Sequence, residues 1–137
     1  MAKKTSSNLE NMAEFTAITT FGSPLSLDVA NQILGYTFGS DGYCAFKAKY
    51  PSGKFEGGTS SPHEGSAPDF MSATHEFNLE ADVSGMTLAE IKQAGADFAQ
   101  LVQDAALELG HDVLACYGEA RLWTTYNYEK PGFARAA

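Results

Sequence analysis

The sequence predicts an α+β domain in which an antiparallel sheet of four to six strands packs on one long helix at about 87–109. Segments near the start, middle and end alternate apolar with polar residues, as half-buried strands do. Between 84 and 109, apolar residues recur every three or four positions, as on one face of a helix. A chain of 137 residues that is 44% apolar suits one domain with its own core. We therefore expect two layers.

The first predicted elements are a strand and a short helix. Phe15 and Phe21 lie on the same side of an alternating segment over 13–21, which indicates a strand. Gly, Ser and Pro then break the pattern. A short helix is expected near 26–34, with Ser26 as its N-cap.

A β-hairpin is predicted over 36–50, because Asp41-Gly42 is a favoured pair for a two-residue turn between two apolar runs. With those residues in the turn, Phe38 lies opposite Ala45. One face of the hairpin then carries aromatic and basic side chains. These are Tyr36, Phe38, Tyr43, Lys47 and Lys49.

The segment 51–69 is rich in Gly, Ser and Pro and is predicted to be a long loop. The residues after it, 70–83, alternate almost without fault and predict a strand with one solvated face. This strand places His75, Phe77 and Leu79 on the inner side.

The long helix has the clearest boundaries. Thr87 and Glu90 have capping-box spacing, and Gly110 is a natural stop. The segment 111–128 follows as one strand, or as two strands bent near Gly118. The predicted core comprises Phe15, Phe21, Cys44, Phe46, Phe77, Leu79, Leu114 and Leu122 against Ile91, Phe98, Val102 and Leu109.

The termini are predicted to be short tails around this domain. Residues 1–11 read as a flexible tail, 12–130 as the domain, and 131–137 as a second tail. No apolar run approaches the roughly 20 residues that span a bilayer, so we expect no membrane partner. The polar start is followed by no apolar stretch, so we expect no signal peptide and a cytoplasmic protein.

The net charge of −8 divides unevenly along the chain. Glu56 to Glu119 contains twelve acidic residues and one basic residue, Lys92, which is −11; the flanks therefore carry +3. An acidic middle argues against wholesale wrapping by DNA or an anionic membrane. It leaves room for a small nucleic-acid site.

The sequence lacks the familiar catalytic motifs, which favours a protein that is not an enzyme and needs no cofactor. Cys44 and Cys116 are far apart, as expected of reduced core thiols. Each histidine is followed by an acid, so three histidines could form a metal site only if they converged. The candidates are His63, His75 and His111; for His75 a hydrogen-bonded core position is the simpler interpretation.

Two surfaces are predicted to mediate binding. The first is an aromatic-basic face of the sheet, formed by the five hairpin residues together with Tyr117, Arg121 and Trp123. Aromatic and basic residues on an open sheet suit either self-association or single-stranded nucleic acid. The second is an acidic surface suited to a basic partner, comprising Glu76, Glu80, Asp82, Glu90, Asp97 and Asp104.

Three functions follow from these surfaces. The leading hypothesis is a small non-enzymatic binding protein that uses its acidic surface for a basic protein partner and its aromatic face for homo-oligomer formation. The alternatives are a single-stranded nucleic-acid binder that uses the aromatic-basic face, and a ligand-binding or metal-dependent enzyme domain. In the last case the pocket would lie under the loop 51–69, with His63, His75 and Glu76 as polar groups.

Overall fold

The computed structural model describes residues 11–62 and 71–124 and contains four strands and three helices. Their order along the chain is β1 (Asn11–Leu25), α1 (Leu27–Phe38), α2 (Asp41–Lys49), β2 (Lys54–Pro62), β3 (Ser72–Asp82), α3 (Leu88–Glu108) and β4 (Val113–Thr124). No helix in the described ranges is long and apolar enough to cross a membrane.

The four strands form one antiparallel sheet in the order β2-β3-β1-β4. The connection from β1 to β2 passes over β3, and the connection from β3 to β4 passes over β1. Two interleaved β-α-β units of this kind make the ferredoxin-like arrangement, with α1 and α2 together in the place of one helix. The α+β class with α3 packed on the sheet is confirmed.

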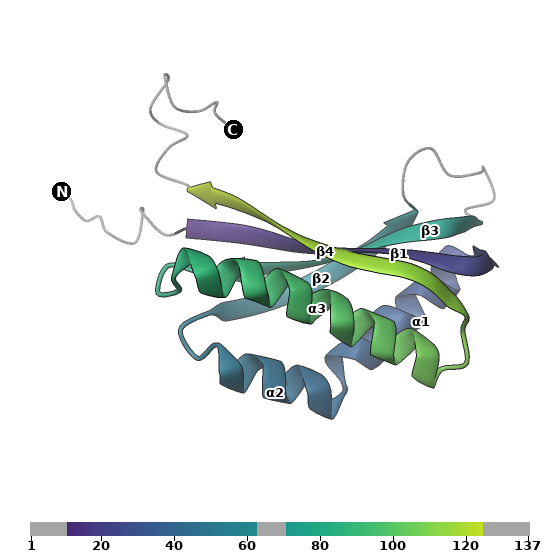
Figure 1. Ribbon diagram of the computed structural model, residues 1–137, viewed down its shortest axis with the longest axis horizontal. Coiled ribbons are helices and arrows are strands. Elements are labelled where there is room, and N and C mark those ends of the chain that lie inside the picture. Colours follow the sequence, from purple (N-terminus) through teal and green to yellow (C-terminus); the bar gives the residue numbers. More distant parts are fainter. Residues whose placement is uncertain (1–10, 63–70, 125–137) are drawn as a thin grey trace, which may run out of the picture.

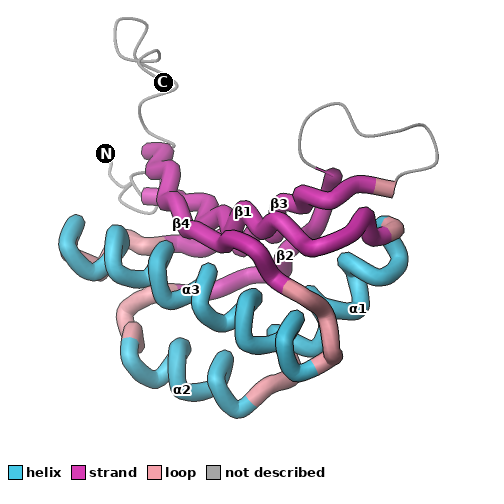
Figure 2. The backbone as a smooth tube through the Cα atoms, turned by 45° about the vertical axis from the view of Figure 1, so that its right-hand side comes forward, coloured by secondary structure: helices cyan, strands magenta, loops and turns pink. Residues whose placement is uncertain are grey.

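All three helices lie on one side of the sheet, and no described helix covers the other side (Figures 1 and 2). The sequence alternation explains which side is covered. In β1, Ala13, Phe15 and Ala17 are fully buried, and in β3 Phe77 and Leu79 are fully buried, all at 0% exposure. The residues between them are only partly buried or exposed. The molecule therefore has a helix-covered face and an open face.

Helix α3 confirms its predicted bounds, and α1 confirms the predicted helix and its N-cap but runs to Phe38, beyond the end predicted near residue 34. The Ser26 side chain accepts a hydrogen bond from the Val29 N–H at the start of α1. The full capping box of Thr87 and Glu90 opens α3, and Gly110 follows its end with a φ of 91°. A left-handed conformation of this kind favours glycine.

The hairpin predicted over 36–50 is wrong, because these residues belong to the end of α1 and to α2. Ser40 caps α2 by accepting the N–H of Tyr43, so Asp41-Gly42 forms the first turn of a helix instead of a hairpin turn. Tyr43 and Phe46 are three residues apart, lie on one side of the helix, and are buried in the core.

The prediction of a loop at 51–69 is wrong for 54–62, which form the edge strand β2; residues 63–69, with His63, lie outside the described residues. The register of β2 on β3 shifts between Phe55 and Gly58. A Cβ atom at Gly58 would lie 2.1 Å from the Asn78 carbonyl oxygen and 2.8 Å from the Phe38 ring. Small residues fit this strand under α1, which is why it shows no apolar periodicity.

The last segment is a single strand, β4, without a break at Gly118. Helix α3 comes unusually close to β4 at this residue: a Cβ atom at Gly118 would lie 2.2 Å from the Gly95 carbonyl oxygen.

Most of the predicted core is buried, including Phe21, Phe98 and Val102. The prediction is wrong for Cys44, Leu109, Leu114 and Leu122, which are exposed. Cys44 lies on the outer side of α2, and the two β4 leucines lie at the sheet edge.

Candidate interaction surface

The open face is defined by residues that point away from the helices. On β1 and β3 they are the partly buried alternate residues, and the strand register extends the set to β4 and β2. The face comprises Met12, Glu14, Thr16, Ile18 and Thr20 of β1; Thr74, Glu76, Asn78, Glu80 and Asp82 of β3; Ala115, Tyr117, Glu119 and Arg121 of β4; and Lys54, Thr59 and Ser61 of β2.

Carboxylates dominate the charge of the open face, where five stand against two basic side chains. Glu14 and Glu80 lie directly opposite each other on neighbouring strands. Like charges in this position repel and destabilise a sheet. Arg121, opposite Glu14 on its other side, offsets this only in part, because its guanidinium is 4.0 Å from the Glu14 carboxylate and largely exposed.

A shallow pocket of about 190 Å³ lies between these two glutamates and the irregular part of β2. Gly57 has no side chain to occupy this space, and Gly58, Thr59 and Asn78 complete the lining. The pocket therefore combines two carboxylates, a hydroxyl and an amide. The two carboxylates supply the negative charge and the acceptors that suit an ammonium or guanidinium group, and the hydroxyl oxygen can accept a further hydrogen bond.

Cross-strand hydrogen bonds join β1 and β3 on the open face, one of them at the pocket and another near the far end of the pairing. The Thr16 hydroxyl donates to the Asn78 side-chain oxygen at 2.8 Å, and the Thr20 and Thr74 hydroxyls lie 3.1 Å apart. Ile18 is only 9% exposed, although it lies on the open face next to Tyr117 in the register. The face is thus ordered at its centre and charged toward the Glu14 end.

The predicted aromatic-basic face does not exist as one surface. Its first five residues lie on α1 and α2, in the helix layer, because their segment is helical. Phe38 and Tyr43 pack together with ring centroids 5.0 Å apart, and Tyr43 is buried. Lys47 lies over the Tyr43 ring. Only Tyr117 and Arg121, with Trp123 at the matching register position of β4, follow the predicted sheet face.

The six residues of the predicted acidic surface occupy two separate places. Glu76, Glu80 and Asp82 lie on β3 at the open face, whereas Glu90, Asp97 and Asp104 lie on α3 in the helix layer. Glu14, which sequence reasoning left out, joins the first group from β1. Its polar position in an alternating strand was the available signal, but the pairing with Glu80 depends on strand order.

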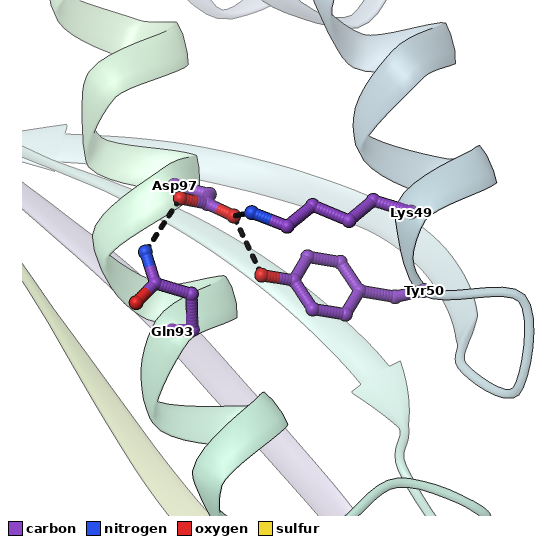
Figure 3. A network of polar contacts seen from close by, with 4 residues as sticks. All are labelled: Lys49, Tyr50, Gln93 and Asp97. Carbon is purple, nitrogen blue, oxygen red and sulfur yellow. Dashed lines mark hydrogen bonds and ion pairs between the residues drawn. The ribbon is translucent and has the colours of Figure 1, made fainter.

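Asp97 joins α3 to α2 through a network of polar contacts (Figure 3). The Lys49 ammonium group donates to its carboxylate at 2.8 Å, the Tyr50 hydroxyl donates at 2.5 Å, and the Gln93 amide donates at 2.9 Å. Burial alone would raise the pKa of Asp97, but these three hydrogen bonds outweigh it and lower that pKa. Burial, and then the neighbouring carboxylate, raise the pKa of Tyr50 to about 12.

We expect Asp97→Ala to lower the free energy of unfolding by about 1 kcal/mol at neutral pH, because three donors lose their acceptor. A carboxyl group with a lowered pKa in the folded state stabilises above its ordinary value of 3.8 and ceases to do so as the pH falls through the folded pKa. Urea unfolding should therefore show a difference from wild type that is full at neutral pH and shrinks as the pH falls below 3.8, through the lowered pKa of the folded state.

The matched control is Asp104→Ala, since Asp104 accepts a hydrogen bond from Gln100, four residues earlier, as Asp97 does from Gln93. The two variants share helix context and charge change, and only Asp97 binds residues of the α2 end. Equal losses of stability in both variants would contradict a role for Asp97 in holding α2.

The remaining candidates do not come together into a site. His75 is fully buried, and its Nε2 lies 3.0 Å from the carbonyl oxygens of Leu25 and Ser72, which confirms a hydrogen-bonded core position. The centroid of the Phe21 ring lies 6.2 Å from the His75 ring centroid and 6.2 Å from the His111 ring centroid. Burial raises the pKa of the Cys116 thiol. Within the described residues, no group of three His, Cys, Asp or Glu side chains could hold a metal ion.

Comparison with known proteins leaves the family open. No family model matches the chain, and no curated protein matches it. Among solved structures, a hydantoinase/carbamoylase family amidase from Burkholderia ambifaria is similar with a TM-score of 0.43 and 8% identity over 85% of this chain. This chain spans 28% of that amidase.

A second similar structure is the C-terminal domain of the MgtC protein from Mycobacterium tuberculosis. Its TM-score is 0.39 at 12% identity, covering 88% of this chain and 94% of that domain. At these TM-scores neither likeness indicates a function for this chain.

Proposed function

We propose that this protein is a small non-enzymatic binding protein whose open face docks a basic surface of a partner protein. The observation that carries the proposal is the Glu14–Glu80 pair, two like charges directly opposite each other beside a pocket that no described residue fills. A lysine or arginine side chain from a partner would relieve their repulsion and form charge-assisted hydrogen bonds.

Other features of the open face support the same partner chemistry. The excess of carboxylates would attract a basic surface at long range, which raises the association rate. The central threonine and asparagine side chains already bond across strands, so little ordering would be needed on binding. Tyr117, 53% exposed beside Ile18, offers an aromatic contact next to the charged region.

We expect Glu80→Gln to weaken binding of a labelled peptide of alternating lysine and valine by about tenfold, because an amide has the shape of the carboxylate but not its charge. The same variant should be slightly more stable than wild type, by a few tenths of a kcal/mol, since a like-charge pair is removed. Fluorescence anisotropy gives the affinity and urea unfolding gives the stability.

The control is Glu108→Gln, which changes the net charge equally but lies at the end of α3. Titrations at low and at physiological ionic strength separate general attraction from a specific site. Equal weakening in both variants would mean that net charge alone governs binding, and would overturn the Glu14–Glu80 pocket as the docking site.

A further inference from the structure

The two edges of the sheet differ in how well they are protected against pairing with another strand. At β2, a register shift, two adjacent glycines and Pro62 interrupt the edge. These are devices that discourage edge-to-edge association. At β4, the pairing with β1 runs from Asn11↔Thr124 to Thr20↔Ala115 without a shift, and β4 contains no proline. Within residues 11–62 and 71–124, no strand pairs with the outer edge of β4.

Exposed apolar side chains gather along this unprotected edge. Of the eight large exposed apolar residues in the part of the chain that the structure describes, six lie on α3, at its C-cap or on β4, namely Leu88, Leu107, Leu109, Leu114, Tyr117 and Leu122. Leu114 is 65% exposed and Leu122 44%, although both lie on the helix-covered side of the sheet. The alternation of residues along β4 predicts that both leucines are buried. They are exposed because β4 is at the edge of the sheet, and the edge therefore presents apolar surface that a partner strand would cover.

The side of α3 nearest β4 carries no acidic residue. On a helical wheel, the four acids of α3, Glu90, Asp97, Asp104 and Glu108, fall within about 40° of one another. The acidic side of α3 faces α2, as the Lys49–Asp97 contact shows. The opposite side faces β4, because the Ala99 carbonyl oxygen accepts a hydrogen bond from the Cys116 thiol of β4. The residues next to Ala99 on this side of the helical wheel are Leu88, Lys92, Ala96, Gln103 and Leu107.

The spacing of the two β4 leucines is self-complementary. Leu114 and Leu122 stand four residues to either side of Gly118. If two copies of β4 paired antiparallel about Gly118, each Leu114 would lie opposite the Leu122 of the other copy, on the helix-covered side. Such a two-fold contact is isologous and closed, and it would place the acid-free sides of the two α3 helices next to each other.

We infer that the β4 edge is a self-association site at which a second copy of this chain pairs antiparallel about Gly118. The partner is a second copy of this chain because Leu114 and Leu122 are spaced symmetrically about Gly118, so each leucine meets the other leucine of an antiparallel copy. In a chain with a net charge of −8, β4 has one acidic and one basic residue, so the strand itself adds no net charge repulsion between two copies. The dimer would contain one continuous eight-stranded sheet and would leave the open face free, independently of the partner proposed above.

Analytical ultracentrifugation of the full chain, from micromolar to sub-millimolar concentrations, tests the dimer. Leu114→Lys and Leu122→Glu should each weaken it by about tenfold or more, because each places a charge opposite a leucine. The double variant should regain most of the affinity, since each introduced lysine then faces an introduced glutamate. Tyr36→Lys, at a similarly exposed aromatic residue on α1, is the control and should leave the dimer unchanged.

Circular dichroism confirms that each variant is folded before its mass is interpreted. A wild-type chain that stays monomeric throughout the concentration range would overturn the inference. A dimer that both single variants leave intact would place the interface elsewhere and would overturn it too. Two weakened single variants without recovery in the double variant would overturn the pairing about Gly118.

Discussion

The Gly118→Ala variant is expected to lose about 3 kcal/mol of unfolding free energy, the upper end of what overpacking costs. The added methyl group would lie 2.2 Å from the carbonyl oxygen of Gly95, 2.9 Å from its carbonyl carbon and 3.0 Å from the Cβ atom of Ala99. These are backbone atoms and a Cβ atom of α3, which cannot rotate out of the way. The helix would have to move off β4 and open the core beneath it.

Two further glycine-to-alanine variants test whether the loss of stability follows the space available to the added methyl group. At Gly95 a Cβ atom would meet the Glu119 carbonyl oxygen at 3.2 Å, so a smaller loss is expected; at Gly35, in α1, nothing lies within 4 Å. Gly35→Ala should stabilise the protein by about 0.5 to 1 kcal/mol, because glycine is a poor helix former. Urea denaturation gives all three values. A Gly118→Ala midpoint equal to wild type would contradict the close approach of α3 and β4.

The second large effect is expected for Phe98→Ala, with a loss of about 3 to 5 kcal/mol. Phe98 is fully buried in the core cluster, and its ring stacks on Phe38 with centroids 6.4 Å apart. Removing the ring leaves a cavity between α3, α1 and the sheet that rigid neighbours fill only in part. At 137 residues this loss would be a large fraction of the total stability.

Tyr36→Ala is the matched control, because Tyr36 is also an aromatic residue of a helix but is 42% exposed. Its loss should stay within about 0.5 kcal/mol, as for most surface substitutions. Thermal and urea unfolding at one protein concentration compare the two. Similar losses in both variants would mean that Phe98 is not part of a tightly packed core.

The elements that were predicted well are those with local signals. The capping box of Thr87 and Glu90, the stop at Gly110 and the cap at Ser26 are formed by residues within a few positions of each other. Local signals also caused the main error. Asp41-Gly42 resembles a hairpin turn, but Ser40 before it caps a helix, and the three- and four-residue spacing of Tyr43, Phe46 and Tyr50 favours one.

The candidate surface was predicted less well than the fold. Alternation placed Glu76 and Glu80 on the solvated side of β3, where the structure has them. The pairing of Glu80 with Glu14, 66 residues earlier in the chain, follows from β1 lying beside β3. The strand β2 was missed because an edge strand of glycine, threonine and serine under α1 has no apolar period to detect.

The sequence by itself determined the α+β class, the bounds of the long helix, the buried side of β1 and β3, and the excess of acidic residues. Only the tertiary structure decided the strand order, the separation of the acids between the open face and α3, and the exposure of Leu114 and Leu122 on the edge. The physical reason is the distance along the chain over which each kind of interaction acts. Caps and periodicity act over a few residues, whereas strand neighbours and helix coverage depend on contacts between distant segments, which no local pattern specifies.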